Sequence, residues 1–211
     1  MVDRAVVFID GNNWYHSIKA LGVVALGRLD YGKVSRKLLE PREWIATRYY
    51  IGRVPQTGDT ALYSAQRRFL ASLSATDVRI STHLGRLEQR PVGDPAANEL
   101  RSYLANLRTR IDPRVYHDLI RIAKDHQNAT ALVEKAVDVM LAVDMVVMAE
   151  RNEFDAAYLL SADGDFTPAV VAVRENGKKV YAASPAAGAQ LGSVVNAFIR
   201  LSPEWFDDCY S

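Results

Sequence analysis

The chain has 211 residues, of which 49% are hydrophobic and 24% are charged. This length gives enough core for a single domain, residues 1–211. The formal net charge is +1, which excludes a strongly basic field over the whole chain as a reason to bind nucleic acid. The single cysteine, Cys209, excludes disulfides, zinc fingers and thiol catalysis.

Two features of the chain predict a soluble, cytoplasmic protein with no membrane partner. A strand begins almost at the start of the sequence, so we expect no signal peptide. The most apolar stretch, residues 136–149, contains Asp138 and Asp144. It is also too short to span a bilayer.

Short runs rich in β-branched and aromatic residues alternate with helical patterns along the chain. The predicted strands are residues 6–9, 44–52, 77–85, 156–162, 178–184 and a short one at 198–199. The predicted helices are residues 31–39, 59–74, 135–151, 167–176 and 188–197. Such alternation indicates an α/β fold, a three-layer sandwich around a central parallel sheet.

One region interrupts this alternation, because no convincing strand follows between Gly85 and about Asn128. Two helical segments, residues 95–111 and 113–126, each begin at a proline, which suits the first turn of a helix. We therefore predict a helical insertion at about residues 86–130. Its apolar residues recur at helical spacing, so one face must be covered, by this domain or by a second copy in a homodimer. These residues are Leu100, Tyr103, Leu104 and Leu107.

Two predicted strands end on acidic residues. Asp10 closes the first strand and is followed by Gly11 and two asparagines, whereas Asp163 and Asp165 follow the fourth strand. The carboxyl ends of parallel strands meet at one edge of a sheet, where ligands bind in α/β folds. The alternative for Asp10 is a helix cap, and for the other two acids a solvated turn.

The segment KAVDVMLAVDMVVMAE (residues 135–150) places Asp138 and Asp144 inside an otherwise apolar helix. Six residues apart, they point about 120° away from each other. They can share a site only if Asp138 lies at or before the amino terminus of the helix. Otherwise one acid is a ligand and the other is paired with Lys135 or with a neighbouring backbone group.

Carboxylates gathered at one sheet edge need a cation. Two of them about 5 Å apart repel by ~3 kcal/mol at an effective dielectric constant near 20, and no run of Lys or Arg lies nearby in the sequence. Oxygen ligands alone favour Mg²⁺ or Mn²⁺ over zinc. A pair of such ions about 4 Å apart suits the attack of water on a phosphodiester.

Three segments in this order, FIDGNN, KAVDVMLAVD and YLLSADGDFTPAV, resemble the NYN family of PIN-like ribonucleases, with the LabA-like group as the nearest branch. The resemblance covers residues 4–84 loosely and 133–201 closely. It implies a PIN-like sandwich with a parallel sheet in the order 3-2-1-4-5. It also implies metal-dependent hydrolysis of RNA.

The resemblance assigns roles to particular residues. It makes Asp10, Asp144 and Asp163 the metal ligands of a Mg²⁺ or Mn²⁺ site. Three further residues complete the catalytic set, namely Asp138, Asp165 and Asn13. Asn12 and the insertion depart from the family pattern, and the insertion leaves substrate access and oligomer contacts open.

Two other functions compete with a nuclease. A haloacid-dehalogenase-type phosphatase would use Asp163 as its nucleophile and Asp165 as its acid, but that signature should open the domain rather than stand near its end. The second alternative is an RNA-binding or regulatory module that has the same fold and cleaves slowly or not at all. Cleavage of RNA that needs both metal and Asp10 would separate the nuclease from this module.

Basic and aromatic residues near the strands are candidates for RNA contacts. Phosphate-binding candidates follow or flank strands two and three, at Arg48, Arg53, Arg86 and Arg90. Stacking candidates are Tyr49, Tyr50 and Tyr103. For the two strand-two tyrosines, packing in the core is the favoured interpretation.

Overall fold

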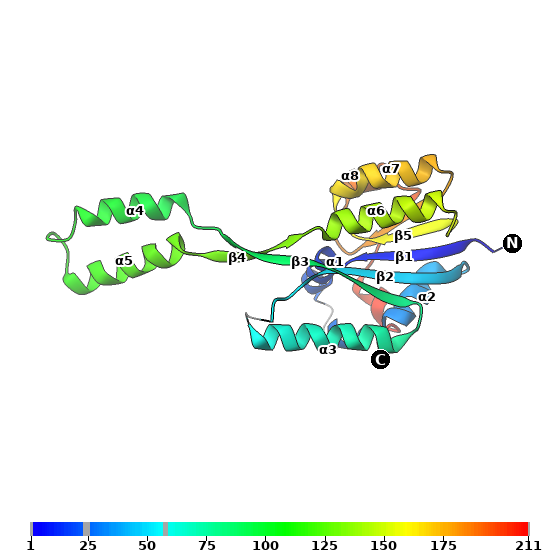
Figure 1. Ribbon diagram of the computed structural model, residues 1–211, viewed down its shortest axis with the longest axis horizontal. Coiled ribbons are helices and arrows are strands. Elements are labelled where there is room, and N and C mark those ends of the chain that lie inside the picture. Colours follow the sequence, from blue (N-terminus) through cyan, green and yellow to red (C-terminus); the bar gives the residue numbers. More distant parts are fainter. Residues whose placement is uncertain (1, 23–25, 57–58, 211) are drawn as a thin grey trace. The chain divides into compact units, whose positions relative to one another are not determined.

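The computed structural model describes residues 2–22, 26–56 and 59–210. The chain divides into two compact units (Figure 1). The first, the sheet unit, consists of residues 1–86 and 135–211, and the second, the helical hairpin, consists of residues 87–134.

The described strands form one mixed sheet in the order β4-β3-β2-β1-β5-β6-β7. They are β1 (Arg4–Asp10), β2 (Glu43–Arg53), β3 (Ile80–Pro91), β4 (Thr130–Lys135), β5 (Ala156–Leu160), β6 (Lys179–Ser184) and β7 (Ala197–Arg200). Along the part of the sheet with the order β3-β2-β1-β5-β6-β7, each strand is parallel to its neighbours.

The predicted sheet, purely parallel in the order 3-2-1-4-5, is not matched. The reason lies in the region read as wholly helical, because β3 continues to Pro91 and β4 begins at Thr130. The short run TALVEK that forms β4 stands between two long helical patterns, which hid its β-branched residues. The predicted helix at residues 188–197 is also wrong, because only four residues are helical before the chain pairs with β6 as β7.

Aspartate side chains begin several of the helices. The helices are α1 (Gly11–Leu21), α2 (Tyr31–Leu39), α3 (Thr60–Thr76), α4 (Pro95–Ala105), α5 (Pro113–Gln127), α6 (Val137–Glu150), α7 (Thr167–Glu175) and α8 (Ala189–Gly192). Their capping carboxylates accept hydrogen bonds from first-turn amides and so satisfy donors that the helix cannot. These caps are Asp10, Asp30, Asp59, Asp94 and Asp112.

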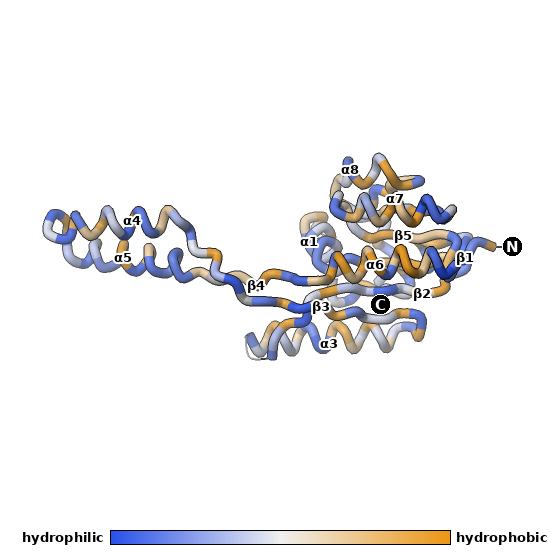
Figure 2. The backbone as a smooth tube through the Cα atoms, turned by 45° about the horizontal axis from the view of Figure 1, so that its top comes forward, coloured by the Kyte–Doolittle hydropathy of each residue, from blue (hydrophilic) through white to orange (hydrophobic). Residues whose placement is uncertain are grey.

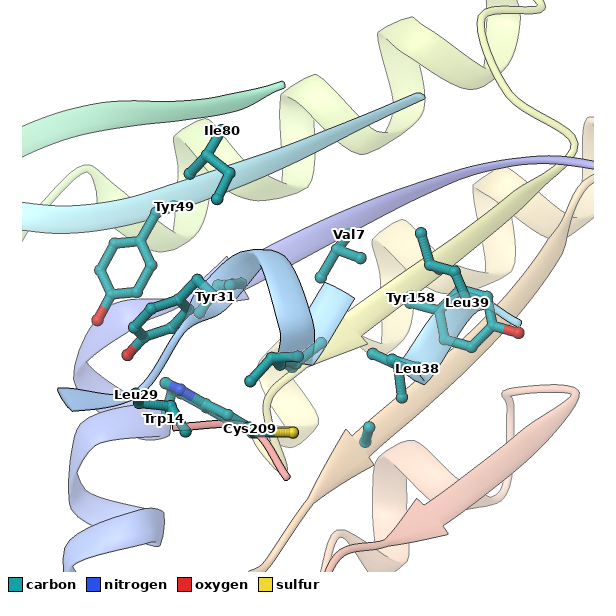
Figure 3. Close-up of a cluster of buried hydrophobic side chains, with 14 of the residues drawn as sticks. Val7, Trp14, Leu29, Tyr31, Leu38, Leu39, Tyr49, Ile80, Tyr158 and Cys209 are labelled. Carbon is teal, nitrogen blue, oxygen red and sulfur yellow. The ribbon is translucent and has the colours of Figure 1, made fainter. Parts of the chain in front are cut away.

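Alternating residues of β1 supply the two halves of the core. Val7 and Ile9 belong to a cluster with residues of α1, α2 and the last segment of the chain (Figure 3). Val6 and Phe8 belong to a second cluster, with residues of α6 and α7. Helices therefore cover both faces of the sheet in the sheet unit (Figure 1), and the alternation puts the next even-numbered residue, Asp10, on the α6 face.

The helical hairpin consists largely of α4 and α5, which run antiparallel (Figure 1). Two helices begin at the predicted prolines, although the first ends at Ala105 and not at residue 111, and each follows an aspartate that caps it. None of the helices in the described ranges is long and apolar enough to cross a membrane.

A buried hydroxyl pair joins α2 to β2. The Ser35 and Thr47 side-chain oxygens lie 2.7 Å apart, and Trp44 Nε1 donates to Thr47 Oγ1 at 2.9 Å. Ser35 and Thr47 are fully buried. Thr47 Oγ1 therefore serves two buried polar groups that have no access to water.

We expect Thr47→Val to lower the free energy of unfolding by about 2–4 kcal/mol, because it keeps the shape and leaves two buried groups without a partner. Ser35→Ala is the matched control, since the Trp44–Thr47 hydrogen bond survives it, and about 1 kcal/mol is expected. Urea unfolding of the three proteins measures both values. Equal losses in the two variants would contradict this role for Thr47.

Candidate active site

The first strand end is shaped by the contact between Gly11 and β2. A Cβ atom at Gly11 would lie 2.5 Å from the Tyr50 carbonyl oxygen and 2.6 Å from the Tyr49 ring. Only glycine lets the chain turn into α1 this close to its neighbour. Asp10, just before this turn, is 3% exposed, and its Oδ1 accepts a hydrogen bond from the backbone amide of Asn13 at 3.2 Å.

Hydrogen bonds join the end of β1 to the end of β5. Ser161 Oγ donates to Asp10 Oδ2 at 3.0 Å and accepts from the Asp163 amide at 3.1 Å. Asn13 Oδ1 accepts from the Ala162 amide at 3.1 Å. Two strand ends that are 151 residues apart in sequence are thus held in one fixed arrangement.

The turn after β5 positions the carboxylates of Asp163 and Asp165. Asp163 Oδ1 accepts from the Asp165 amide at 2.9 Å and begins the short helix η2 (Gly164–Phe166). This hydrogen bond is typical of a turn, and a solvated turn was the alternative to a functional role for these two acids. Asp163 is half-buried and Asp165 is exposed, so both carboxylates retain access to a ligand.

A close contact with β3 fixes the beginning of α6. A Cβ atom on Gly85 would collide with the Val137 side chain and with the Lys135 carbonyl oxygen, which lies 2.7 Å from its position. The chain then passes through Ala136 at a φ of 68° and starts α6 at Val137. Asp138 therefore stands in the first turn of α6.

Electrostatics show that these acids act on one another. Burial raises the pKa of the Asp10 carboxyl to about 6, against the hydrogen bonds from Asn13 and Ser161. The charges of Asp138 and Asp163 raise it further. Partial desolvation raises the pKa of Asp138, and the charges of Asp163 and Asp165 add to this effect. Asp10, Asp138, Asp163 and Asp165 thus form one group, called the acidic cluster below.

Asp144 is held elsewhere. Its Oδ2 accepts hydrogen bonds from Arg48 Nη2 and from Tyr50 Oη, both at 2.7 Å. Partial burial opposes ionisation of Asp144, but these two hydrogen bonds outweigh it and lower the pKa. Of the two helix acids, only Asp138 is therefore brought to the cluster, and the partners of Asp144 are Arg48 and Tyr50 instead of the expected Lys135 or a neighbouring backbone group.

The helix period explains this separation. Six residues place Asp144 about 9 Å further along α6 than Asp138 and about 120° around it. Arg48 and Tyr50 lie on the same face of β2, two residues apart, where they meet the middle of α6. Arg48, a candidate phosphate ligand, is thus an ion-pair partner of Asp144. Tyr49 and Tyr50 are buried in the core, which was the favoured interpretation for these two residues.

The acidic cluster carries uncompensated negative charge. Among the residues that the structure describes, no Lys or Arg forms an ion pair with any of its four carboxylates. Within the same ranges, no three His, Cys, Asp or Glu side chains are arranged to hold a metal ion as they stand. The donors fit Mg²⁺ or Mn²⁺ in chemistry, because they are all oxygens, and they are not closed into a shell.

Sequence reasoning missed two residues that shape the site. Ser161 is not among the predicted site residues, yet a hydroxyl that ends a fully buried strand needs a partner, and this was the available signal. Gln190 of α8 lies over the turn after β5, where its side chain occupies the space that a Cβ atom on Gly164 would need. Nothing near Gln190 in sequence indicated this contact.

The chain matches the NYN domain over residues 82–202, which is more than half of its length. It therefore belongs to the NYN domain family, a family of PIN-like proteins that are generally nucleases acting on RNA. Asp138, Asp144, Asp163 and Asp165 lie inside the matched segment, whereas Asp10 and Asn13 precede it. The match confirms the predicted family and does not distinguish the LabA-like branch.

A solved structure also resembles this fold. It is the crystal structure of a protein of unknown function from Vibrio parahaemolyticus, with 16% sequence identity and a TM-score of 0.58. The match covers 100% of this chain and 97% of that chain. At this identity the likeness shows the fold alone. No curated protein matches the sequence, and no comparison supports the predicted homodimer.

The raised pKa of Asp10 predicts a pH-dependent stability in metal-free buffer. The folded-state pKa of about 6 lies above the ordinary 3.8, so the contribution of Asp10 is complete below pH 3.8 and is lost as the pH rises through 6. The loss amounts to at most about 3 kcal/mol by pH 7. Asp10→Asn should remove it.

The measurement is the free energy of unfolding of wild type and Asp10→Asn, from urea titrations at pH 4 and pH 7 with a chelator present. Relative to wild type, the variant should gain stability between the two pH values. A stability difference that does not change with pH would show that Asp10 titrates normally in the folded protein.

Proposed function

We propose that the protein is a metal-dependent ribonuclease that hydrolyses RNA phosphodiester bonds at the acidic cluster. The observation that carries this proposal is the set of four interacting carboxylates at the carboxyl edge of the sheet, in a chain of the NYN family, with no cation of the described chain paired to them. A site of this charge repels RNA phosphates unless a metal ion neutralises it.

Asp10, Asp138 and Asp163 are the residues that we propose to hold Mg²⁺ or Mn²⁺. This set replaces Asp144 with Asp138, because Arg48 and Tyr50 already engage the Asp144 carboxylate. When bound, the cation would supply an activated water and would stabilise charge on the phosphate. Asp165 is exposed beside this set and is suited to hold a water or the substrate.

The chain's own hydrogen bonds would organise the reaction. Ser161 holds one oxygen of Asp10 and the backbone of Asp163, so the two carboxylates keep a fixed relation. Asn13 contributes indirectly, since its side-chain oxygen fastens the start of α1 to the end of β5. Positioning of this kind lowers the reorganisation needed for catalysis.

Membership of the NYN family favours this function over the phosphatase, and the segment order that resembles the LabA-like branch supports the same choice. The alternative that stays close is an RNA-binding or regulatory module with the same fold. It is favoured by one observation, namely that the carboxylates do not yet form a closed shell. A cytoplasmic location is the expectation for either function.

The test compares two aspartate-to-asparagine variants in the cleavage of a labelled single-stranded RNA with Mg²⁺ or Mn²⁺. Asp163→Asn deletes charge from the acidic cluster and should lower the rate by about 100-fold or more. Asp144→Asn is the matched control, because it makes the same chemical change at a carboxylate that is paired with Arg48 outside the acidic cluster. This variant should retain most of the activity. Chelation should stop the wild-type reaction.

Three results would contradict the proposal. The first is full activity of Asp163→Asn. The second is a loss in Asp144→Asn as large as in Asp163→Asn, which would return Asp144 to the site. The third is wild-type protein that binds the RNA but does not cleave it with either Mg²⁺ or Mn²⁺, which would establish the RNA-binding module. Inhibition by beryllofluoride, a mimic of an acyl phosphate, would instead indicate the phosphatase.

A further inference from the structure

The helical hairpin leaves much of its apolar surface uncovered. Among its residues whose burial the structure describes, the buried hydrophobic ones are Ala97, Leu104 and Ala123. Large apolar side chains on the same two helices are exposed, namely Leu100 (41%), Tyr103 (63%), Val115 (50%) and Ile122 (46%). Apolar and polar residues mix along both helices (Figure 2). A unit of about 50 residues with so little core normally needs a further surface to pack against.

These exposed residues share one face of the hairpin. At 100° per residue, Leu100 and Tyr103 lie about 40° and 100° to one side of the buried Leu104. Val115 and Ile122 lie about 80° and 100° to the same side of the buried Ala123. In an antiparallel pair of helices, equal rotation in the same sense leads to the same face. We call this surface the apolar face.

The two ends of the hairpin carry opposite charge. The loop end, residues 106–116, has three arginines against one aspartate. The open end, residues 92–99 and 123–128, has three acids against one lysine. Over residues 87–134 the acidic and basic residues are equal in number, so the hairpin as a whole offers no positive field for RNA.

We propose that the apolar face binds the apolar face of a second copy of this chain. The two hairpins lie antiparallel, so the basic loop end of each meets the acidic open end of the other, and the four helices form a bundle. A twofold axis makes such a contact self-complementary and closed. Four helices around a shared apolar core are a stable arrangement where two are not.

This inference is independent of the nuclease activity, because it concerns residues outside the acidic cluster. The first test is the oligomeric state of the full chain by sedimentation velocity. Wild type should be a dimer, and Ile122→Glu, which puts a charge into the apolar face, should raise the dimer Kd by about 100-fold or more. Val78→Glu is the matched control, since Val78 is 99% exposed in the sheet unit.

The second test addresses the antiparallel arrangement. Arg110→Glu reverses a charge at the loop end and should weaken the dimer by about 10-fold, whereas Arg68→Glu, the same change on exposed α3, should leave it unaltered. Circular dichroism checks that each variant keeps its helices. In a parallel arrangement two basic loop ends would face each other, and Arg110→Glu would tighten the dimer.

The proposal is overturned by a wild-type protein that stays monomeric at 100 µM, or by an Ile122→Glu variant that dimerises like wild type. It is also overturned if the monomer binds single-stranded RNA and Ile122→Glu abolishes that binding, because the apolar face would then serve RNA. Tightening of the dimer by Arg110→Glu excludes the antiparallel arrangement.

Discussion

The burial of Asp10 is the constraint on which the rest of the site depends. A carboxylate at 3% exposure is costly unless hydrogen bonds or a cation compensate it. The backbone amide of Asn13 and the Ser161 hydroxyl supply part of this compensation. The Ser161 hydrogen bond also joins the ends of β1 and β5. Asp138 and Asp163 act in the opposite direction, by adding negative charge. At neutral pH the site thus lowers the stability of the fold until a ligand of positive charge binds, which is the usual mark of a functional site.

Helix α6 contributes one residue to the site and another to its packing against β2, and the two lie about 120° apart around the helix. Its first turn is pressed against Gly85 of β3, and this places Asp138 at the acidic cluster. Its middle is held to β2 by the ion pair of Asp144 with Arg48, which Tyr50 joins. We infer that Asp144 belongs to the packing of α6 against β2 and does not contact the ligand.

Much of this arrangement could be predicted from local patterns. The strand that ends on Asp10, the helical segments at residues 31–39 and 167–176, and the acidic turn after β5 all follow from short-range periodicity and turn chemistry. The partner of Asp144 could not be predicted, because it sits 96 residues away on β2 and depends on which face of α6 meets the sheet. The same limit hid β4, Ser161 and Gln190, whose roles arise from long-range packing. The length of α8 was missed because the pairing of β7 with β6 overrides helical propensity.

The most direct test of the account is the position of a bound cation in a crystal of the protein soaked in Mn²⁺, located by its anomalous scattering. The account predicts a peak in direct contact with carboxylate oxygens of Asp10 and Asp163, with Asp138 as a further ligand, while the Arg48–Asp144 pair stays intact. A peak coordinated by Asp144, or a saturated crystal with no peak at the acidic cluster, would contradict it.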